Sequence, residues 1–296
     1  MNLTSTEFKI LQEVAKTAAI KAGSYIQSQF DKHYIKKVKE GGDSLASQVV
    51  TEVDLKAQEI ILSHLQKTIA TYDLGLLTEE SVDDQSRTKK DYFWCIDPMD
   101  GTLPFTERRT GYSVSIALIS NAGDPIIGVV YIPDIEACYS AIKGNGVLLN
   151  DKPFDRNDTE TDTSLHFYMD LSFQSEEHFD FVKFKMKELI GQKEITEIQH
   201  HADFGGVRNA VSVMSSNKSC YFKFSKKRNG GGSIWDYAST RLFFEELGLN
   251  VTNSAGSTLH LNNPQTTFMN DQGIVYTTDA ALSQFIIEMG RQVSEC

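Results

Sequence analysis

The amino-acid sequence of 296 residues predicts an α+β fold. Two helical patterns come first, a run of short apolar segments separated by turn residues follows, and both types mix in the second half. Helices that precede a mostly antiparallel sheet are typical of α+β proteins. Because the pattern changes near residue 155, we expect an N-terminal α+β lobe over residues 1–155 and a C-terminal α/β lobe over residues 156–296 that completes the site.

The chain begins with a helical pattern. Between about residues 5 and 30, apolar residues return at steps of three and four, as one face of an amphipathic helix requires. Thr4 and Glu7 stand three residues apart at its start, which predicts a capping box. Thr51 and Asp54 repeat this signal, so we expect a second helix over about residues 51–69.

Short apolar segments predict a sheet between the second helix and residue 155. They are "GLL", "YFWCI", "YSVSIALIS", "PIIGVVYIP" and two shorter ones around residues 144–146. A hairpin-like turn at 121–124 should join the third to the fourth. Further on, we expect a polar loop, a helix near 176–190, strands near 207–224, a helix over about 234–247 ended by Gly248, a strand near 273–277 and a helix near 280–293.

The composition bounds the class of protein. With 40% hydrophobic and 23% charged residues, it is ordinary for a globular protein in water, and no apolar run approaches the roughly 20 residues that span a bilayer. The net charge of -11 argues against a nucleic-acid polymer or an anionic membrane as partner, and it is compatible with bound divalent cations. The four cysteines are far apart, so we expect no zinc site or disulfide scaffold, and a reduced cytoplasmic protein.

Carboxylates follow apolar segments at four places in the chain. These are Asp54, Glu79 with Glu80, Asp97 with Asp100, and Asp236. Buried carboxylates must be paired or coordinated, and no lysine or arginine stands directly beside them. Magnesium needs only a few carboxylates together with water and substrate phosphate.

Each of these carboxylates also has an ordinary structural explanation. Asp54 and Asp236 can cap helices, Asp97 can end a strand at a turn, and Glu79 can lie at a solvated strand end. Their joint occurrence, each after an apolar run, favours a metal site. A calcium loop of the Asp-x-Asp-x-Asp-Gly type is not present.

The segment "DPMDGT" at residues 97–102 places two carboxylates close together. Its proline fixes its own φ and biases Asp97 toward extended backbone. Gly101 permits a tight turn or a close approach to an anion. The carbonyl of Met99 can then face a cation between the two aspartates, and Thr102 offers a hydroxyl beside it.

Three motifs together resemble the inositol monophosphatase superfamily of magnesium-dependent, lithium-sensitive phosphatases. They are "EES" at 79–81, "DPMDGT" at 97–102 and "WDYA" at 235–238, and the resemblance covers roughly residues 8–280. It implies a layered αβαβα sandwich of the inositol monophosphatase and fructose-1,6-bisphosphatase type. It also implies a phosphomonoesterase that hydrolyses a small phosphorylated metabolite with water activated by two or three magnesium ions.

The resemblance also implies roles for individual residues. The first magnesium would bind Glu79, Asp97 and the Met99 carbonyl; the second would bind Asp97, Asp100 and Asp236; a third, weaker ion would involve Glu79. Thr102, oriented by Asp54, would help deprotonate the attacking water, so the candidate catalytic residues are Thr102, Asp54 and Glu79. The amides of Gly101 and Thr102 would receive phosphate oxygens.

The substrate is less specified. Lys223 stands where the inositol enzymes carry a glutamate, and a cation suits a second phosphate better than a neutral polyol. Gly205 begins "GGVRNA", which matches the family loop that approaches the substrate's non-reacting half. The basic run Lys226-Lys227-Arg228 follows, although it could be only a solvated loop.

We therefore favour a 3′(2′),5′-bisphosphate nucleotidase that converts adenosine 3′,5′-bisphosphate to AMP. An inositol-1-monophosphatase is the first alternative, and a catalytically silent metal- or phosphate-binding homologue is the second. The residues after Thr102 match neither enzyme pattern. The oligomeric state is open, a homodimer included.

Overall fold

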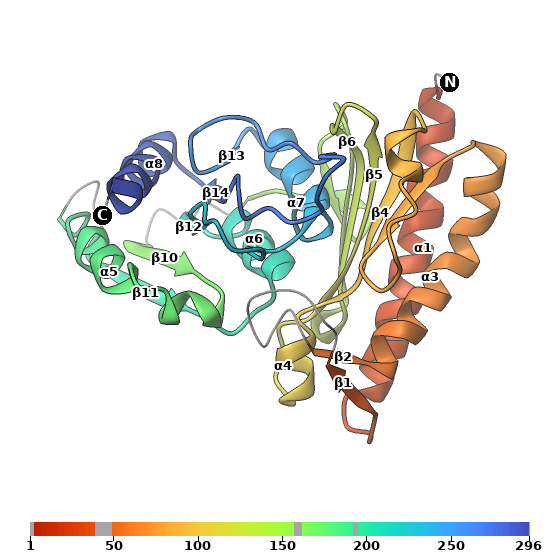
Figure 1. Ribbon diagram of the computed structural model, residues 1–296, viewed down its shortest axis with the longest axis horizontal. Coiled ribbons are helices and arrows are strands. Elements are labelled where there is room, and N and C mark those ends of the chain that lie inside the picture. The colour runs from red at the N-terminus through yellow and green to blue at the C-terminus, as the bar shows by residue number, and fades with distance from the viewer. Residues whose placement is uncertain (1–2, 39–48, 157–161, 192–194, 296) are drawn as a thin grey trace.

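Five layers of secondary structure make up the protein (Figure 1). The computed structural model describes residues 3–38, 49–156, 162–191 and 195–295. The first outer layer holds helices α1 (Ser5–Gln29) and α3 (Glu52–Thr71), and a seven-stranded sheet follows it. Next come helices α6 (Gly206–Met214) and α7 (Ile234–Glu246), a five-stranded sheet, and the second outer layer with helices α5 (Phe179–Lys187) and α8 (Ala280–Glu295). The predicted αβαβα sandwich is therefore confirmed.

The two outer helices begin at the residues that the sequence predicts. Thr4 and Glu7 form a capping box at α1, and Thr51 and Asp54 form one at α3. Each helix turns an apolar face onto the seven-stranded sheet, where Leu11 and its neighbours are buried among strand side chains. These contacts fix the N-terminus of α3, and Asp54 with it, against the sheet.

The seven-stranded sheet has the order β3-β4-β5-β6-β7-β8-β9, with β3 and β4 parallel and the other neighbours antiparallel. Its strands are β3 (Gly75–Thr78), β4 (Tyr92–Asp100), β5 (Ser113–Ser120), β6 (Pro125–Ile132), β7 (Ala137–Ile142), β8 (Val147–Leu149) and β9 (Lys152–Pro153). The predicted turn at 121–124 joins β5 to β6. Because β4 lies next to β3 in the sheet, the ends of both strands reach the same edge.

The five-stranded sheet has the order β11-β10-β12-β14-β13. Its strands are β10 (Ser164–Tyr168), β11 (Glu197–His201), β12 (Lys218–Lys223), β13 (Asn250–Thr252) and β14 (Ile274–Thr277). Helices α5 (Phe179–Lys187) and α8 (Ala280–Glu295) cover its outer face. Strands β10 and β11 are additions to the expected elements, and β11 at the sheet edge is mostly polar and exposed, so it carries little apolar signal.

The middle layer corrects one expectation. Residues 207–214 were expected to start a strand region, but they belong to helix α6 (Gly206–Met214), and only β12 of that region is a strand. Val207, Ala210, Val211 and Met214 are buried at helical spacing between the sheets, which overrides the strand preference of valine. Helix α7 (Ile234–Glu246) packs beside α6 and against β5 and β6.

Short elements complete the fold. They are β1 (Lys36–Val38), β2 (Val49–Thr51), α4 (Thr102–Thr106) and three 3-10 turns, η1 (Ser86–Thr88), η2 (Pro133–Ile135) and η3 (Leu171–Ser175). In the described ranges, no helix has both the length and the apolar character that a membrane crossing requires. Cys95, Cys138 and Cys220 are buried free thiols, and Cys296 lies outside the described residues. The division into lobes at residue 155 stays a prediction.

Candidate metal centre and active-site cleft

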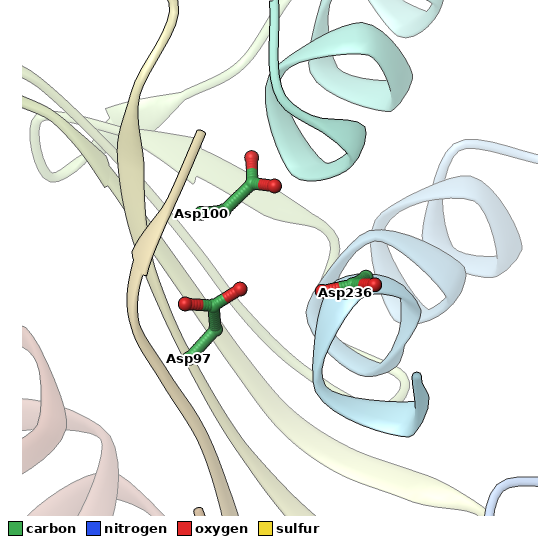
Figure 2. Close-up of side chains that lie close together, drawn as sticks. All are labelled: Asp97, Asp100 and Asp236. Carbon is green, nitrogen blue, oxygen red and sulfur yellow. The ribbon is translucent and has the colours of Figure 1, made fainter. Parts of the chain in front are cut away.

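Three aspartates meet where β4 ends against α7. Figure 2 shows the carboxylates of Asp97 and Asp100 on the strand turned toward Asp236 on the helix. Ligand oxygens from the three side chains all lie within 4.8 Å of one another. Asp97 and Asp100 are buried, and Asp236 is half-buried. A set of oxygen donors this close is suited to a hard divalent cation.

A β-bulge turns Asp97 and Asp100 to the same side. On a regular strand, residues three apart point to opposite faces. Here Asp97 pairs with Ser115 of β5 whereas Asp100 pairs with Ser113, so β4 advances by one residue more than β5. The extra residue re-aims the end of the strand. The amide of Met99 donates to Asp97 Oδ1 at 3.0 Å and fixes this turn.

Asp100 also holds the first turn of α6. Its Oδ1 accepts from the amide of Gly206 at 2.9 Å, and its Oδ2 accepts from the amide of Val207 at 3.0 Å. Free amides and the helix dipole at this position favour a negative group. A Cβ at Gly205 would lie 2.3 Å from Asp100 Oδ2, so only glycine fits there without displacement.

Asp236 is fixed by the start of its own helix. It occupies the third position of α7, and Ser233 and Asp236 form a capping box in which the amide of Ser233 donates to Asp236 Oδ2 at 2.8 Å. Gly232 precedes this cap with φ +84, and a Cβ there would lie 2.5 Å from Asp236 Oδ2. The helix-cap explanation and the metal-site explanation of Asp236 are therefore compatible.

The carboxylates raise one another's pKa values. Burial, followed by the charge of Asp236, raises the pKa of Asp100 to about 8. Burial and then the charge of Glu79 raise the pKa of Asp236 to about 6, and Lys223 opposes this shift. Burial, with Glu79 next, raises the pKa of Asp97 well above its ordinary value. A bound divalent cation would offset this repulsion, so the donor set fits magnesium.

Thr102 and Asp54 form a hydrogen-bonded pair beside the three aspartates. Thr102 Oγ1 donates to Asp54 Oδ1 at 2.8 Å and lies 3.1 Å from the carbonyl oxygen of Met99. Asp54 Oδ2 accepts from both the amide and the hydroxyl of Thr51, at 2.8 and 2.6 Å. Burial raises the pKa of Asp54 to about 6, although the hydrogen bonds from Thr51 and Thr102 lower it.

Gly101 starts α4 in the left-handed region, with φ +85. A Cβ on this residue would lie 2.6 Å from the carbonyl oxygen of Gly111. The turn at the end of β4 can therefore be this tight only with glycine.

A cleft of about 700 Å³ opens in front of this group. Of the residues singled out from the sequence, it is lined by Glu79, Asp97, Met99, Asp100, Gly101, Thr102, Gly205, Lys223 and Asp236. Asp54 reaches the cleft through Thr102. The structure thus brings every predicted site residue to one place.

Lys223 does not carry an unbalanced charge in this cleft. Its Nζ lies 2.5 Å from Asp170 Oδ2, and the two side chains are 14% and 27% exposed. Burial lowers the pKa of Lys223, but the charge of Asp170 outweighs it and the net shift is upward. Substrate would meet an ammonium–carboxylate pair here.

Sequence reasoning missed several charged residues of the cleft. Asp170 follows the end of strand β10 by two residues, and a carboxylate after an apolar run is the signal that marked Asp97 and could have identified it. Arg109 pairs with Glu107 and Asp203, and Glu176 pairs with Lys226 and Arg228. Glu176 stands at the start of the helix expected near 176–190, and only the fold shows that this helix start faces the cleft.

The fold and site define a five-layer αβαβα sandwich in which clustered carboxylates, suited to a divalent cation, lie between the two sheets. The model of the inositol monophosphatase family matches residues 9–294, so the chain belongs to this family. Members of the family are magnesium-dependent phosphatases that act on phosphoric monoesters.

Two relatives illustrate how partial the similarity to individual proteins is. The 3′(2′),5′-bisphosphate nucleotidase CysQ of Shigella flexneri is 40% identical over 96 residues, which cover 32% of this chain and 38% of that protein. Inositol monophosphatase 1 of Solanum lycopersicum is 34% identical over 141 residues, covering 47% of this chain and 49% of that protein. The matched part spans less than half of either relative.

Solved structures show the same fold over nearly the whole chain. The extragenic suppressor protein suhB from Bartonella henselae has a TM-score of 0.72 at 20% identity, with 95% of this chain and 98% of that chain covered. A dual inositol monophosphatase and NADP phosphatase, solved with Mg²⁺ and phosphate, has a TM-score of 0.70 at 17% identity, with 95% of each chain covered.

Proposed function

We propose that this protein is a magnesium-dependent phosphomonoesterase. The observation that carries the proposal is the convergence of three carboxylates within 4.8 Å beside the Thr102–Asp54 pair. Family membership supports it independently. A catalytically silent homologue is disfavoured because the three aspartates and Thr102 line one cleft and Thr102 is hydrogen-bonded to Asp54.

The residues that would hold magnesium are Glu79, Asp97, Asp100, Asp236 and the carbonyl of Met99, for two or three ions. Magnesium, when bound, supplies charge neutralisation for the phosphate and acidifies a water molecule. Asp97 interacts electrostatically with Glu79, Asp100 and Asp236, so its two carboxylate oxygens could serve more than one ion. Gly101 and Thr102 would orient phosphate oxygens through their amides.

Thr102 and Asp54 would act on the proton of the attacking water. A water beside Thr102 Oγ1 can donate to this oxygen while Thr102 donates to Asp54. A carboxyl with a pKa of about 6 can accept a proton near neutral pH and release it again. This relay needs no covalent intermediate on the protein.

For the substrate, we propose a nucleoside bisphosphate such as adenosine 3′,5′-bisphosphate, with inositol 1-phosphate as the alternative. The partial similarity to the bisphosphate nucleotidase CysQ supports the first, and that to inositol monophosphatases supports the second. Lys223 and Gly205 would contact the half of the substrate that does not react. With Lys223 paired to Asp170, this contact suits a sugar hydroxyl, which can donate to the carboxylate and accept from the ammonium.

A substrate panel tests the proposal. Phosphate release is measured from adenosine 3′,5′-bisphosphate, inositol 1-phosphate and fructose 1,6-bisphosphate, with magnesium, with EDTA and with lithium added. We expect magnesium-dependent release that lithium inhibits, fastest from the adenosine compound. If no phosphomonoester releases phosphate, the proposed enzymatic activity is refuted and the hypothesis of a catalytically silent homologue remains.

Lys223→Met tests the role of the ammonium–carboxylate pair. We expect KM to rise about tenfold for every nucleotide substrate, because Asp170 is left half-buried without its counter-charge. The Tm must be compared first, since the same change removes a buried ion pair. An unchanged KM in a folded variant would exclude Lys223 from the substrate site.

A further inference from the structure

Two cations of the cleft converge on a single carboxylate. Lys226 Nζ lies 3.3 Å from Glu176 Oε1, and Arg228 Nη2 lies 2.6 Å from the same oxygen. All three residues line the cleft that holds the three aspartates. The group of Lys226, Arg228 and Glu176, here called the basic clamp, therefore combines two positive charges with one negative charge.

The basic clamp differs from the other charged groups of the described cleft. Lys223 is matched one to one with Asp170. Arg109 is met by two carboxylates, those of Glu107 and Asp203. Among these three groups, the basic clamp is the one whose own members carry a net positive charge. It offers a second anionic group on a substrate two cationic side chains.

The backbone holds the basic clamp in a defined position. The amide of Lys226 donates to the Asn270 carbonyl at 2.7 Å, and Asn270 Nδ2 donates to the Lys226 carbonyl at 3.1 Å. On the other side, the carbonyl of Glu176 accepts from the amide of Phe179, at the start of α5. Lys226 and Glu176 are half-buried, whereas Arg228 is 58% exposed and is held in place by its ion pair with Glu176.

The clamp is also tied to the metal centre through a short segment. Arg228 is followed by Gly230, Gly231 and Gly232, all with positive φ, which return the chain to the helix cap that fixes Asp236. Lys226 and Arg228 thus stand ten and eight residues before Asp236 and line the same cleft. A substrate with two anionic groups could therefore contact the clamp with one of them while the other lies at the metal centre.

Resting on the proposed phosphomonoesterase activity, we propose that the basic clamp binds the second, non-reacting phosphate of a bisphosphate substrate. The glutamate acts as a placeholder. In the protein without substrate it keeps the two cations together, and a phosphate with its higher charge and three acceptor oxygens replaces it. The arginine guanidinium can then offer two parallel N–H donors to one phosphate.

Comparison of a bisphosphate with a monophosphate tests this proposal. The double variant Lys226→Gln with Arg228→Gln is compared with wild type on adenosine 3′,5′-bisphosphate and on adenosine 3′-phosphate, which lacks the second phosphate. We expect KM for the bisphosphate to rise at least about tenfold with kcat nearly unchanged, and KM for the monophosphate to change less than about threefold. Glu176→Gln should lower KM for the bisphosphate selectively, because the carboxylate that competes with phosphate for Lys226 and Arg228 is lost.

Lys227→Gln is the matched control, since it removes one positive charge from the same loop at a residue that does not line the cleft. It should leave both KM values within about twofold. Equal rises of KM on both substrates in the double variant, or no rise on either, would overturn the proposal.

A binding measurement separates this inference from the proposed activity. Calorimetric titration of adenosine 3′,5′-bisphosphate into the protein with EDTA requires no turnover. If wild type hydrolyses no phosphomonoester, the proposed function fails, but weaker binding by the double variant than by the Lys227→Gln control still supports the clamp. Identical binding by wild type and the double variant would refute the clamp whatever the activity is.

Discussion

Asp100 belongs to the cluster of three aspartates and also accepts hydrogen bonds from the first amides of α6. Asp100→Asn removes a negative charge from the metal centre and turns one acceptor oxygen into a donor that faces a helix amide. We expect phosphate release to fall at least about 100-fold, because even residues that only support metal ligands cost 10–100-fold. Circular dichroism should show a folded protein, and activity close to wild type in that protein would refute the role of Asp100.

Thr102 can be tested by a change that keeps its shape. Thr102→Val removes the hydroxyl that donates to Asp54 Oδ1 and leaves a buried carboxylate oxygen without this donor. We expect kcat to fall by about 10²–10⁴-fold, as for loss of a positioned proton-transfer group. Thr102→Ser is the control, since it keeps the hydroxyl. Similar kcat values for the serine and valine variants would exclude a proton relay at this position.

Local sequence patterns identified individual residues of the site for physical reasons. Asp97, Asp100 and Asp236 each follow an apolar segment, and such segments end near the rim of a sheet or helix layer. The distance among them could not be predicted, because it depends on the bulge in β4 and on contacts between segments more than 130 residues apart. Pairing of Lys223 with Asp170 was missed because it likewise joins distant segments.

At the scale of elements, α6 shows how packing overrides local preference. Its valines favour strands, but its buried positions follow the helical period. The expectation of a strand over 207–214 was therefore wrong. Helices α1 and α3 were predicted well because the capping-box residues and the helical spacing of apolar residues indicate the same helix start. Strand β11 carries little apolar signal because it is polar and exposed, whereas β10 is mostly buried and its apolar signal was overlooked.

The contact of α6 with Asp100 depends on Gly205. In Gly205→Ala the new Cβ would come within 2.3 Å of Asp100 Oδ2, so α6 or the carboxylate must shift. We expect magnesium affinity, measured by calorimetry, to fall about tenfold or more, together with the Tm.

Gly144→Ala provides the control for this change. Gly144 has φ +81 and no atom near its Cβ position, so alanine there costs about 1 kcal/mol of backbone strain without touching the site. It should lower the Tm but not the affinity for magnesium. Unchanged affinity in Gly205→Ala would mean that the helix does not position Asp100.

At the scale of the whole molecule, the site joins both halves of the chain. Strand β4 comes from the seven-stranded sheet, whereas α6 and α7 follow residue 200. Helix α7 nevertheless packs on β5 and β6 of the first sheet. The halves therefore meet through the same helices that carry Asp236 and hold Asp100. Repulsion among these carboxylates therefore lowers the free energy of unfolding of the whole protein.

This repulsion predicts how stability depends on pH. The folded-state pKa values of Asp54 and Asp236 are raised to about 6 and that of Asp100 to about 8. The folded protein therefore holds protons that the unfolded chain has already released, and this contribution is lost as pH rises through these values. In EDTA we expect the Tm to fall from about pH 5 to 9, by on the order of 2–4 °C for each kcal/mol lost. Added magnesium should remove most of this decrease in Tm. The Asp100→Asn variant should show a smaller decrease in Tm near pH 8. A Tm in EDTA that rises steadily over this range would show that the aspartates do not repel one another in the folded protein.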